Sequence, residues 1–429
     1  MFKRFCSFLL ATVFLSIPVL AAPAPTHTVN AKSAILYEVT TDTVLLEQNA
    51  DERVYPASTT KLMTALVAME YGNPTDTITV TREAVDGLYE LGSSSYLLAG
   101  EEIGFMDLMR YMLVASGNDA ANAFAIHISG SVKDFTELMN STARRLGCTN
   151  THFTNPHGLH DADHYTSARD LLLIARAAMK NETIAKIVAE DEVTLPVTNK
   201  HDRTTTKYST NYLLSKKANG DYYYEGAVGI KTGTTTPAGL CLVAACVKGD
   251  YTYYSVVMGA SKEENGRSGQ FDETIRLFNY GAETFSQQVM LSSSEPITEV
   301  PVRLSDEKDA AVLTPSENIV AMLPNTFEKS DLKLDYTVKE GVTAPVKAGD
   351  VLGKLTVTYG EKQYEMDLVA ASDISRSTLL YVLDRITGFF TSTAFKVAVA
   401  AVVALVAVFV AYVIIVNRRR AKRRRNRRR

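Results

Sequence analysis

Ser58 and Lys61 stand three residues apart in the stretch PASTTKLM, at the expected start of a helix. Residues at this spacing share one face of a helix, so the Lys61 amine can reach the Ser58 hydroxyl. A serine hydroxyl is a poor nucleophile without a base beside it, and lysine becomes a base when burial or a second cation lowers its pKa. The pair therefore predicts a Ser58 nucleophile with Lys61 as its base.

Two further motifs follow in an order that makes this prediction more specific. The S-x-x-K pattern alone is weak evidence, because it also occurs at Ser305 and Ser330. Ser116-Gly117-Asn118 follows a helical pattern, and Lys231-Thr232-Gly233 ends the apolar strand pattern AVGI. A glycine in a strand permits close approach of another backbone, here expected to be a substrate. The three motifs together predict one catalytic cleft.

The elements that must position these motifs form a mixed α/β (α+β) domain over residues 30–287. An early hairpin, a helical middle and late strands with a last helix imply that the two ends of the domain meet in one sheet. A small all-β domain is expected at 297–371. The hairpin is expected at 33–47, helices at 57–71, 106–146, 167–189 and 272–287, and strands at GIKTG, GLCLVAACVKG and TYYSVVMGA.

Both ends of the chain carry targeting signals. Residues 1–22 have the basic start and apolar run of a signal peptide, with an uncleaved anchor as the alternative. Residues 373–396 form a linker, and 397–416 is a charge-free stretch long enough to span a membrane. The basic tail, 417–429, then predicts a single-pass protein with its tail in the cytoplasm and its catalytic domain outside. A nucleic-acid-binding tail is the competing interpretation.

The net charge of −3 conceals an acidic body. Without the twelve basic residues of the two ends, 33 basic and 48 acidic residues remain, about −15 for residues 23–417, so no nucleic-acid partner is expected. Apart from Cys6 in the signal, an odd number of cysteines remains, which gives no disulfide framework. Cys241 and Cys246, five apart in one strand, should point to opposite faces. No metal or cofactor is predicted, because the sequence has no close His/Cys cluster with metal-ligand spacing.

The motifs and their flanking sequences resemble the D-alanyl-D-alanine carboxypeptidases among the low-molecular-mass penicillin-binding proteins. The resemblance covers nearly all of 30–285, and residues 297–371 resemble the second domain of that family. It rests on LLEQNADERVYPASTTKLMTALV, LLAGEEIGFMDLMRYMLVASGNDAANAFA, FTNPHGLHDADHYTSARDLL and GAVGIKTGTTTPAGLCLVAA. It implies a penicillin-binding/β-lactamase-like transpeptidase domain, with an antiparallel sheet and a helical subdomain, that removes D-alanine from peptidoglycan stem peptides and is acylated by β-lactams.

The same resemblance implies a role for each motif residue. Ser58, Lys61 and Ser116 would be catalytic, with Ser116 passing a proton to the leaving amine. Asn118 would hold the substrate amide. Lys231 would keep Lys61 deprotonated and attract the terminal carboxylate. Thr232 and Thr234 would donate hydroxyls beside Gly233, and the backbone N–H groups of Ser58 and Thr234 would form the oxyanion hole.

Several alternatives remain beside this interpretation. His157 in NPHGLH invites a triad with Ser58, but Lys61 already fills the role of base. Arg267 is a candidate extra contact for the substrate carboxylate, and Tyr222–Tyr224 could line a substrate groove or simply pack in a loop. A β-lactamase is disfavoured because residues 119–230 lack an E-x-x-L-N loop. A non-catalytic wall-binding protein is the third possibility, although no motif residue is missing.

Family members often end in a helix lying on the membrane, which leaves surface attachment open.

Overall fold

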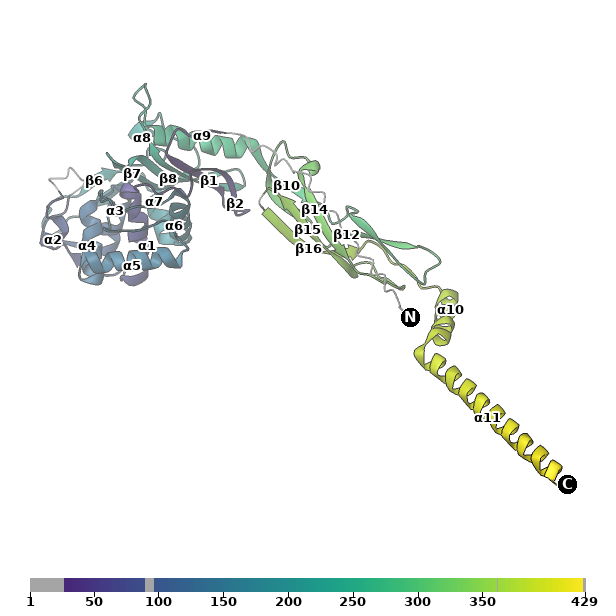
Figure 1. The fold of residues 1–429 in the computed structure, drawn as a ribbon. Coiled ribbons are helices and arrows are strands. Elements are labelled where there is room, and N and C mark those ends of the chain that lie inside the picture. Colours follow the sequence, from purple (N-terminus) through teal and green to yellow (C-terminus); the bar gives the residue numbers. More distant parts are fainter. Residues whose placement is uncertain (1–26, 89–95, 361, 427–429) are drawn as a thin grey trace. The chain divides into compact units, whose positions relative to one another are not determined.

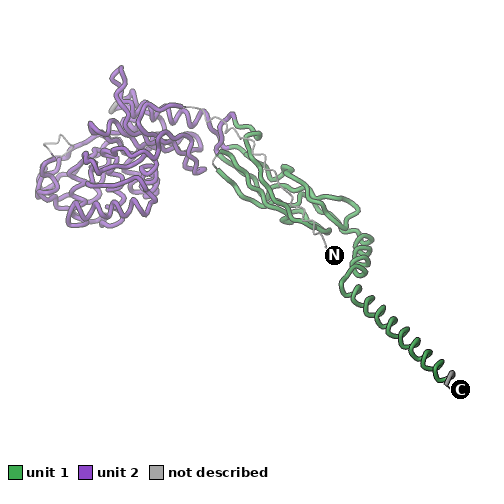
Figure 2. Tube along the Cα trace, viewed as in Figure 1, with its two compact units in different colours: residues 1–22, 288–321, 327–429 green, residues 23–287, 322–326 purple. Residues whose placement is uncertain are grey.

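The computed structural model describes residues 27–88, 96–360 and 362–426. The predicted signal peptide and the last three residues of the basic tail lie outside the described residues. Contacts divide the chain into two compact units, which Figure 2 shows in different colours. The catalytic unit comprises 27–287 with 322–326, and the C-terminal unit comprises 288–321 with 327–426.

A five-stranded antiparallel sheet forms the centre of the catalytic unit, with the strand order β2-β1-β9-β8-β7. Strand β1 pairs with β2 in the expected hairpin and with β9 on its other side. The early and late parts of the domain therefore meet in one sheet, as predicted. Strand β7, which carries the K-T-G motif, lies at an edge. The strands are β1 (Ser33–Glu38), β2 (Thr43–Gln48), β7 (Ala227–Thr235), β8 (Gly239–Lys248) and β9 (Tyr251–Ala260).

Helices cover both faces of this sheet and enclose two hydrophobic cores (Figure 1). Helix α6 packs on β1 and β9 in the larger core, and α9 packs on β8 and β9 in the smaller core. Cys241 belongs to the larger core and Cys246 to the smaller, which confirms that they point to opposite faces. Both thiols, and that of Cys148, are free and buried.

The main helices of this unit lie in or next to the expected helical ranges, whereas its short strands and its two four-residue helices occur where no element was expected. Ser131 and Ser167 begin α5 and α6, because each side chain accepts a backbone N–H three residues further on. The elements are η1 (Ala57–Thr60), α1 (Lys61–Tyr71), β3 (Thr77–Thr79), α2 (Arg82–Val85), β4 (Glu102–Gly104), α3 (Phe105–Val114), α4 (Asn118–Ser129), α5 (Val132–Arg145), α6 (Ala168–Lys180), α7 (Glu182–Val188), β5 (Glu192–Leu195), β6 (Thr205–Tyr208), α8 (Lys216–Asn219) and α9 (Gly269–Thr284).

The C-terminal unit contains the predicted all-β domain. Its main sheet has five strands in the order β11-β12-β16-β15-β14. Strands β10 and β13 pair in a second sheet, and along the chain each of them crosses the boundary between the two units. Alternation of apolar and polar residues buries one face of β12 and β15. The strands are β10 (Phe285–Leu291), β11 (Thr298–Pro301), β12 (Ala310–Pro315), β13 (Ile319–Pro324), β14 (Lys333–Val338), β15 (Val351–Tyr359) and β16 (Lys362–Ala370), with η2 (Lys329–Asp331) between β13 and β14.

Two helices end the described chain. The segment expected as a linker contains α10 (Thr378–Thr391), and α11 runs over Thr393–Asn426. Within the described residues one helix, over Thr393–Arg423, is long and apolar enough to cross a membrane, and its apolar window is entirely exposed. It contains the predicted span 397–416. The overall fold class, a mixed α/β catalytic domain followed by a small β domain and an apolar helix, is confirmed.

Candidate active site

The nucleophile turn, residues 56–60, presents Ser58 at the start of α1. Ala57 takes a left-handed conformation with φ 47°, and Thr60 Oγ1 donates to the Ala57 carbonyl at 2.8 Å. Thr59 Oγ1 donates to the Pro56 carbonyl at 2.7 Å. These local hydrogen bonds hold a tight turn that opens directly into the helix, and they leave the Ser58 side chain partly exposed.

Lys61 points from the first turn of α1 back toward Ser58. Its Nζ lies 2.9 Å from Ser58 Oγ, 2.6 Å from Asn118 Oδ1 and 2.8 Å from the His157 carbonyl oxygen. A neutral amine has two N–H groups and one lone pair, which match two acceptors and one hydroxyl donor. Burial, and then the nearby charge of Lys231, lower the pKa of Lys61 well below its usual value. The arrangement therefore favours an uncharged amine beside the serine.

The SGN turn, residues 116–118, joins α3 to α4 and brings Asn118 to Lys61. Ser116 takes φ 63° and is buried. Gly117 packs against Tyr111, where a Cβ would stand 2.4 Å from the ring, so no larger residue fits. Asp119 accepts hydrogen bonds from the backbone N–H groups of Tyr96 and Leu97 at 2.6 and 2.8 Å. These two bonds hold residues 96–97 against the start of α4.

Strand β7 places the K-T-G motif along the nucleophile turn. A Cβ on Gly233 would stand 2.8 Å from the Pro56 carbonyl oxygen and 2.9 Å from the Ser58 nitrogen. The glycine is thus required by the protein's own nucleophile turn, whereas the sequence suggested a substrate in that place. Thr232 Oγ1 lies 2.5 Å from Thr210 Oγ1, and Thr234 is exposed.

Lys231 is a second buried amine in the same site. Its side chain is 1% exposed, and Nζ donates to the Thr232 carbonyl at 3.2 Å. Burial lowers the pKa of Lys231 to about 7, so the group is partly protonated at neutral pH. Its charge is one cause of the lowered pKa of Lys61, which is the electrostatic effect expected of it.

The loop of residues 155–160 supports the nucleophile turn in a way that the sequence did not indicate. The main-chain carbonyl of His157 accepts a hydrogen bond from Lys61, and Nδ1 of the His157 ring accepts one from the Leu159 N–H at 3.1 Å. Burial holds the pKa of His157 at about 3. Gly158 has φ 89°, and a Cβ there would stand 1.8 Å from the Ala57 carbonyl oxygen. The NPHGLH segment acts through its backbone, which gives no support to a His157 triad.

His164 is another supporting residue that sequence analysis missed. Its Nδ1 accepts from the Thr154 N–H at 3.1 Å, so Nε2 carries the proton and donates to Thr60 Oγ1 at 2.8 Å. Thr60 Oγ1 in turn donates to the Ala57 carbonyl oxygen. Burial lowers the pKa of His164 to about 4, which keeps the ring neutral. No sequence motif marks this residue, because Thr60, which it supports, lies 104 positions away in the chain.

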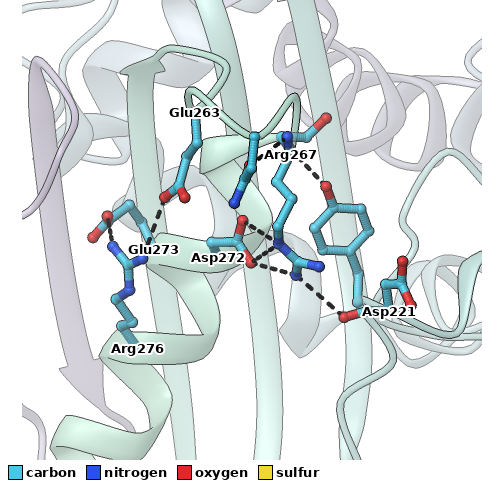
Figure 3. A network of polar contacts seen from close by, with 9 residues as sticks. Asp221, Glu263, Arg267, Asp272, Glu273 and Arg276 are labelled. Atoms are coloured by element: carbon cyan, nitrogen blue, oxygen red, sulfur yellow. Dashed lines mark hydrogen bonds and ion pairs between the residues drawn. The ribbon is translucent and has the colours of Figure 1, made fainter.

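Arg267, the candidate extra contact for a carboxylate, is engaged by the protein itself (Figure 3). Its guanidinium forms an ion pair with Asp272 at 2.6 Å and donates to the Asp221 carbonyl at 3.3 Å. It also lies 4.6 Å from the ring centroid of Tyr222. The Arg267 guanidinium thus links the 221–224 loop to α9. Because its donors bind these protein groups, the structure argues against Arg267 as a contact for the substrate carboxylate. Tyr222 is buried against Phe271, so it packs in the loop.

A hydroxyl next to a buried amine with a lowered pKa, with a second buried amine along an edge strand, is suited to acyl transfer to serine. The structure brings Ser58, Lys61 and Asn118 into direct contact and sets Gly233 against the backbone of Ser58. Fold and site together define a serine hydrolase of the penicillin-binding type.

Comparison with known proteins identifies the family. A family model described as D-alanyl-D-alanine carboxypeptidase (peptidase S11) matches residues 19–262, and one described as the C-terminal domain of penicillin-binding protein 5 matches 285–376. The chain belongs to the D-alanyl-D-alanine carboxypeptidase family and is a serine-type carboxypeptidase.

Similar proteins share both parts of the chain. D-alanyl-D-alanine carboxypeptidase DacF of Bacillus subtilis is 32% identical over 372 residues, which cover 84% of this chain and 90% of DacF. DacC of Escherichia coli is 32% identical and covers 82% of this chain and 85% of DacC. The structure of penicillin-binding protein 5 from Haemophilus influenzae aligns with a TM-score of 0.58 at 31% identity, over 82% of this chain and 99% of that one.

Proposed function

We propose that this protein removes the terminal D-alanine from peptidoglycan stem pentapeptides through an acyl-enzyme on Ser58. The observation that carries the proposal is the buried Lys61 amine, 2.9 Å from Ser58 Oγ, with a pKa lowered by burial and by Lys231. A general base must be within hydrogen-bond reach of the proton it takes, and the lowered pKa of Lys61 favours the uncharged form that a base requires. The names of the similar proteins supply the substrate class.

In the first stage the Ser58 proton passes to Lys61, and Oγ attacks the carbonyl carbon between the last two D-alanines. The backbone N–H groups of Ser58 and Thr234 stabilise the oxyanion, and loss of one such donor costs about 3 kcal/mol of transition-state stabilisation. The C–N bond then breaks, and Ser116 passes a proton to the departing amine. The products of this stage are D-alanine and an ester on Ser58.

The remaining motif residues hold the peptide in place. Asn118 binds the substrate amide, and Lys231 attracts the terminal carboxylate together with the hydroxyls of Thr232 and Thr234. Gly233 keeps β7 close to the nucleophile turn. Because β7 is an edge strand, an extended peptide can lie beside it.

In the second stage water hydrolyses the ester and releases a peptide that is one D-alanine shorter. A transpeptidase needs the D-alanyl-D-alanine bond to donate its acyl group, so this hydrolysis limits cross-linking of the wall. β-lactams present a similar carbonyl and become covalent inhibitors that stay on Ser58.

Replacement of the nucleophile tests the proposal. Ser58→Ala in the full chain, purified in detergent, is expected to abolish both D-alanine release from a pentapeptide and labelling by a fluorescent penicillin. Ser141→Ala on the exposed surface of α5 is the matched control and should retain both. Persistence of either activity in Ser58→Ala refutes the assignment.

The lifetime of the penicillin adduct separates the alternatives. Mass spectrometry of the unmodified protein should show one long-lived adduct on the peptide that contains Ser58. Rapid loss of the adduct with fast turnover of nitrocefin would indicate a β-lactamase. Absence of both an adduct and D-alanine release would indicate a non-catalytic wall-binding protein.

We also propose that α11 anchors the protein as a single span, with the catalytic unit outside the membrane and the basic tail in the cytoplasm. Support comes from the exposed apolar stretch of α11 and from the basic residues that follow it directly. Washing membranes with high salt or carbonate should leave the protein bound. Clean release would indicate surface attachment.

A further inference from the structure

A cavity of about 360 Å³ opens in the catalytic unit beside the nucleophile turn. Its wall includes Tyr55, three residues before Ser58, and Pro237 with Ala238, which follow the end of β7. The volume lies in the range of sites for small ligands. None of the residues assigned to the reaction lines this cavity, so the proposed chemistry leaves it without a role.

The course of β7 places the cavity on the upstream side of the scissile bond. Gly233 lies against the Ser58 backbone. Of the three residues assigned to the substrate carboxylate, Lys231 and Thr232 precede Gly233 in β7, and Thr234 follows it. Pro237, in the cavity wall, comes after it. A peptide with its carboxylate at Lys231 and its scissile carbonyl at Ser58 therefore continues in the direction of the cavity.

The distances are suitable for the residue that precedes the two D-alanines. Consecutive Cα atoms are about 3.8 Å apart, so Tyr55 is at most about 11 Å from Ser58 along the chain. In the substrate the preceding residue begins only one such step upstream of the acylated D-alanine. A long side chain at that position can then enter the cavity.

The charges around the cavity have both signs. Glu52 supplies a carboxylate, and Lys32 and Arg53 supply two cations. Within the described part of the chain, none of these three side chains forms an ion pair with another residue. Arg53 is held in place, since its guanidinium lies 4.6 Å from the ring centroid of Tyr165 and its Nε donates to Asn150 Oδ1 at 3.4 Å. This set of charges complements a ligand group that carries an ammonium and a carboxylate together.

We propose that the cavity is a subsite for the residue preceding the two D-alanines and selects a diamino acid of the diaminopimelate class. Glu52 binds the side-chain ammonium, and Arg53 with Lys32 binds the side-chain carboxylate. A lysine side chain would satisfy Glu52 alone. The inference rests on the proposed D-alanyl-D-alanine carboxypeptidase reaction and specifies which stem peptides that reaction prefers.

The test compares kcat/KM for D-alanine release from two acylated peptides of the form X-D-Ala-D-Ala, using the full chain in detergent. In the first peptide, X is meso-diaminopimelate. In the second peptide, X is the same residue with its distal carboxylate replaced by the uncharged amide, which has the same shape. Unmodified protein should prefer the carboxylate about tenfold, which corresponds to about 1.4 kcal/mol. The double variant Lys32→Gln, Arg53→Gln should lose this preference, and Glu52→Gln should lower kcat/KM for both peptides.

Lys133→Gln and Glu137→Gln, on the surface of α5, are the matched controls and should keep the preference. Acylation by penicillin, which has no diamino acid, should stay the same in all these variants and shows that the catalytic cluster is intact. Equal kcat/KM for the two peptides, or a preference that survives the double variant, overturns the subsite while penicillin labelling upholds the acyl-enzyme. Absence of both D-alanine release and labelling overturns the proposed function and the subsite with it.

Discussion

Replacing Gly158 by alanine should impair catalysis without touching any residue that carries out the chemistry. Gly158 has φ 89°, and an added Cβ would stand 1.8 Å from the Ala57 carbonyl oxygen. Real Cβ atoms essentially never come closer than 3.0 Å to such a neighbour, so the two segments must separate by about 1.2 Å. Whichever segment moves, the site changes, because Ala57 precedes Ser58 and the carbonyl next to Gly158 holds Lys61.

A displacement of about 1 Å between reacting groups commonly costs about 100-fold in rate. We therefore expect Gly158→Ala to lower the second-order rate constant of acylation by a fluorescent penicillin by about this factor. The left-handed backbone adds a separate cost of about 1–2 kcal/mol to folding, because alanine disfavours positive φ.

Gly147 provides a control for the backbone effect. It has φ 87°, but no atom lies within 4 Å of its ideal Cβ position. Gly147→Ala should therefore carry the same conformational cost in a urea titration and leave the acylation rate unchanged. An acylation rate of Gly158→Ala within twofold of that of Gly147→Ala would refute the positioning role of the loop.

Three further predictions follow from the buried titratable groups. The pKa of Lys231 is about 7, so kcat/KM for D-alanine release should fall as pH rises through that value, and a rate still rising to pH 9 contradicts this. The pKa values of His157 and His164 are about 3 and 4, below the unfolded value near 6.5, so the unfolded chain binds protons first and stability falls below pH 6.5. The loss at pH 5 should be about 2 kcal/mol for each histidine, and equal urea-unfolding free energies at pH 7 and 5 would exclude it. Burial raises the pKa of Cys148 and Cys246 to about 12, so maleimide should label these thiols only after denaturation, as read by peptide mapping.

Local sequence was sufficient for the main elements of the catalytic unit and for the contact between Ser58 and Lys61. The hairpin before Ser58, the helices on either side of the SGN turn and the strands after residue 226 follow from short-range periodicity and from capping residues. The three-residue spacing of Ser58 and Lys61 spans one helical turn, so their contact was predictable from the sequence alone. The opposite faces of Cys241 and Cys246 follow in the same way from the two-residue period of a strand.

Only the tertiary structure decided the environment of these groups. The pKa of Lys61 depends on burial and on Lys231, which is 170 positions away in the chain. The role of Gly158 depends on a close approach to Ala57, and Arg267 is engaged by Asp272 where the sequence suggested a substrate contact. Desolvation and close packing are properties of residues brought together from distant parts of the chain, so no local pattern records them.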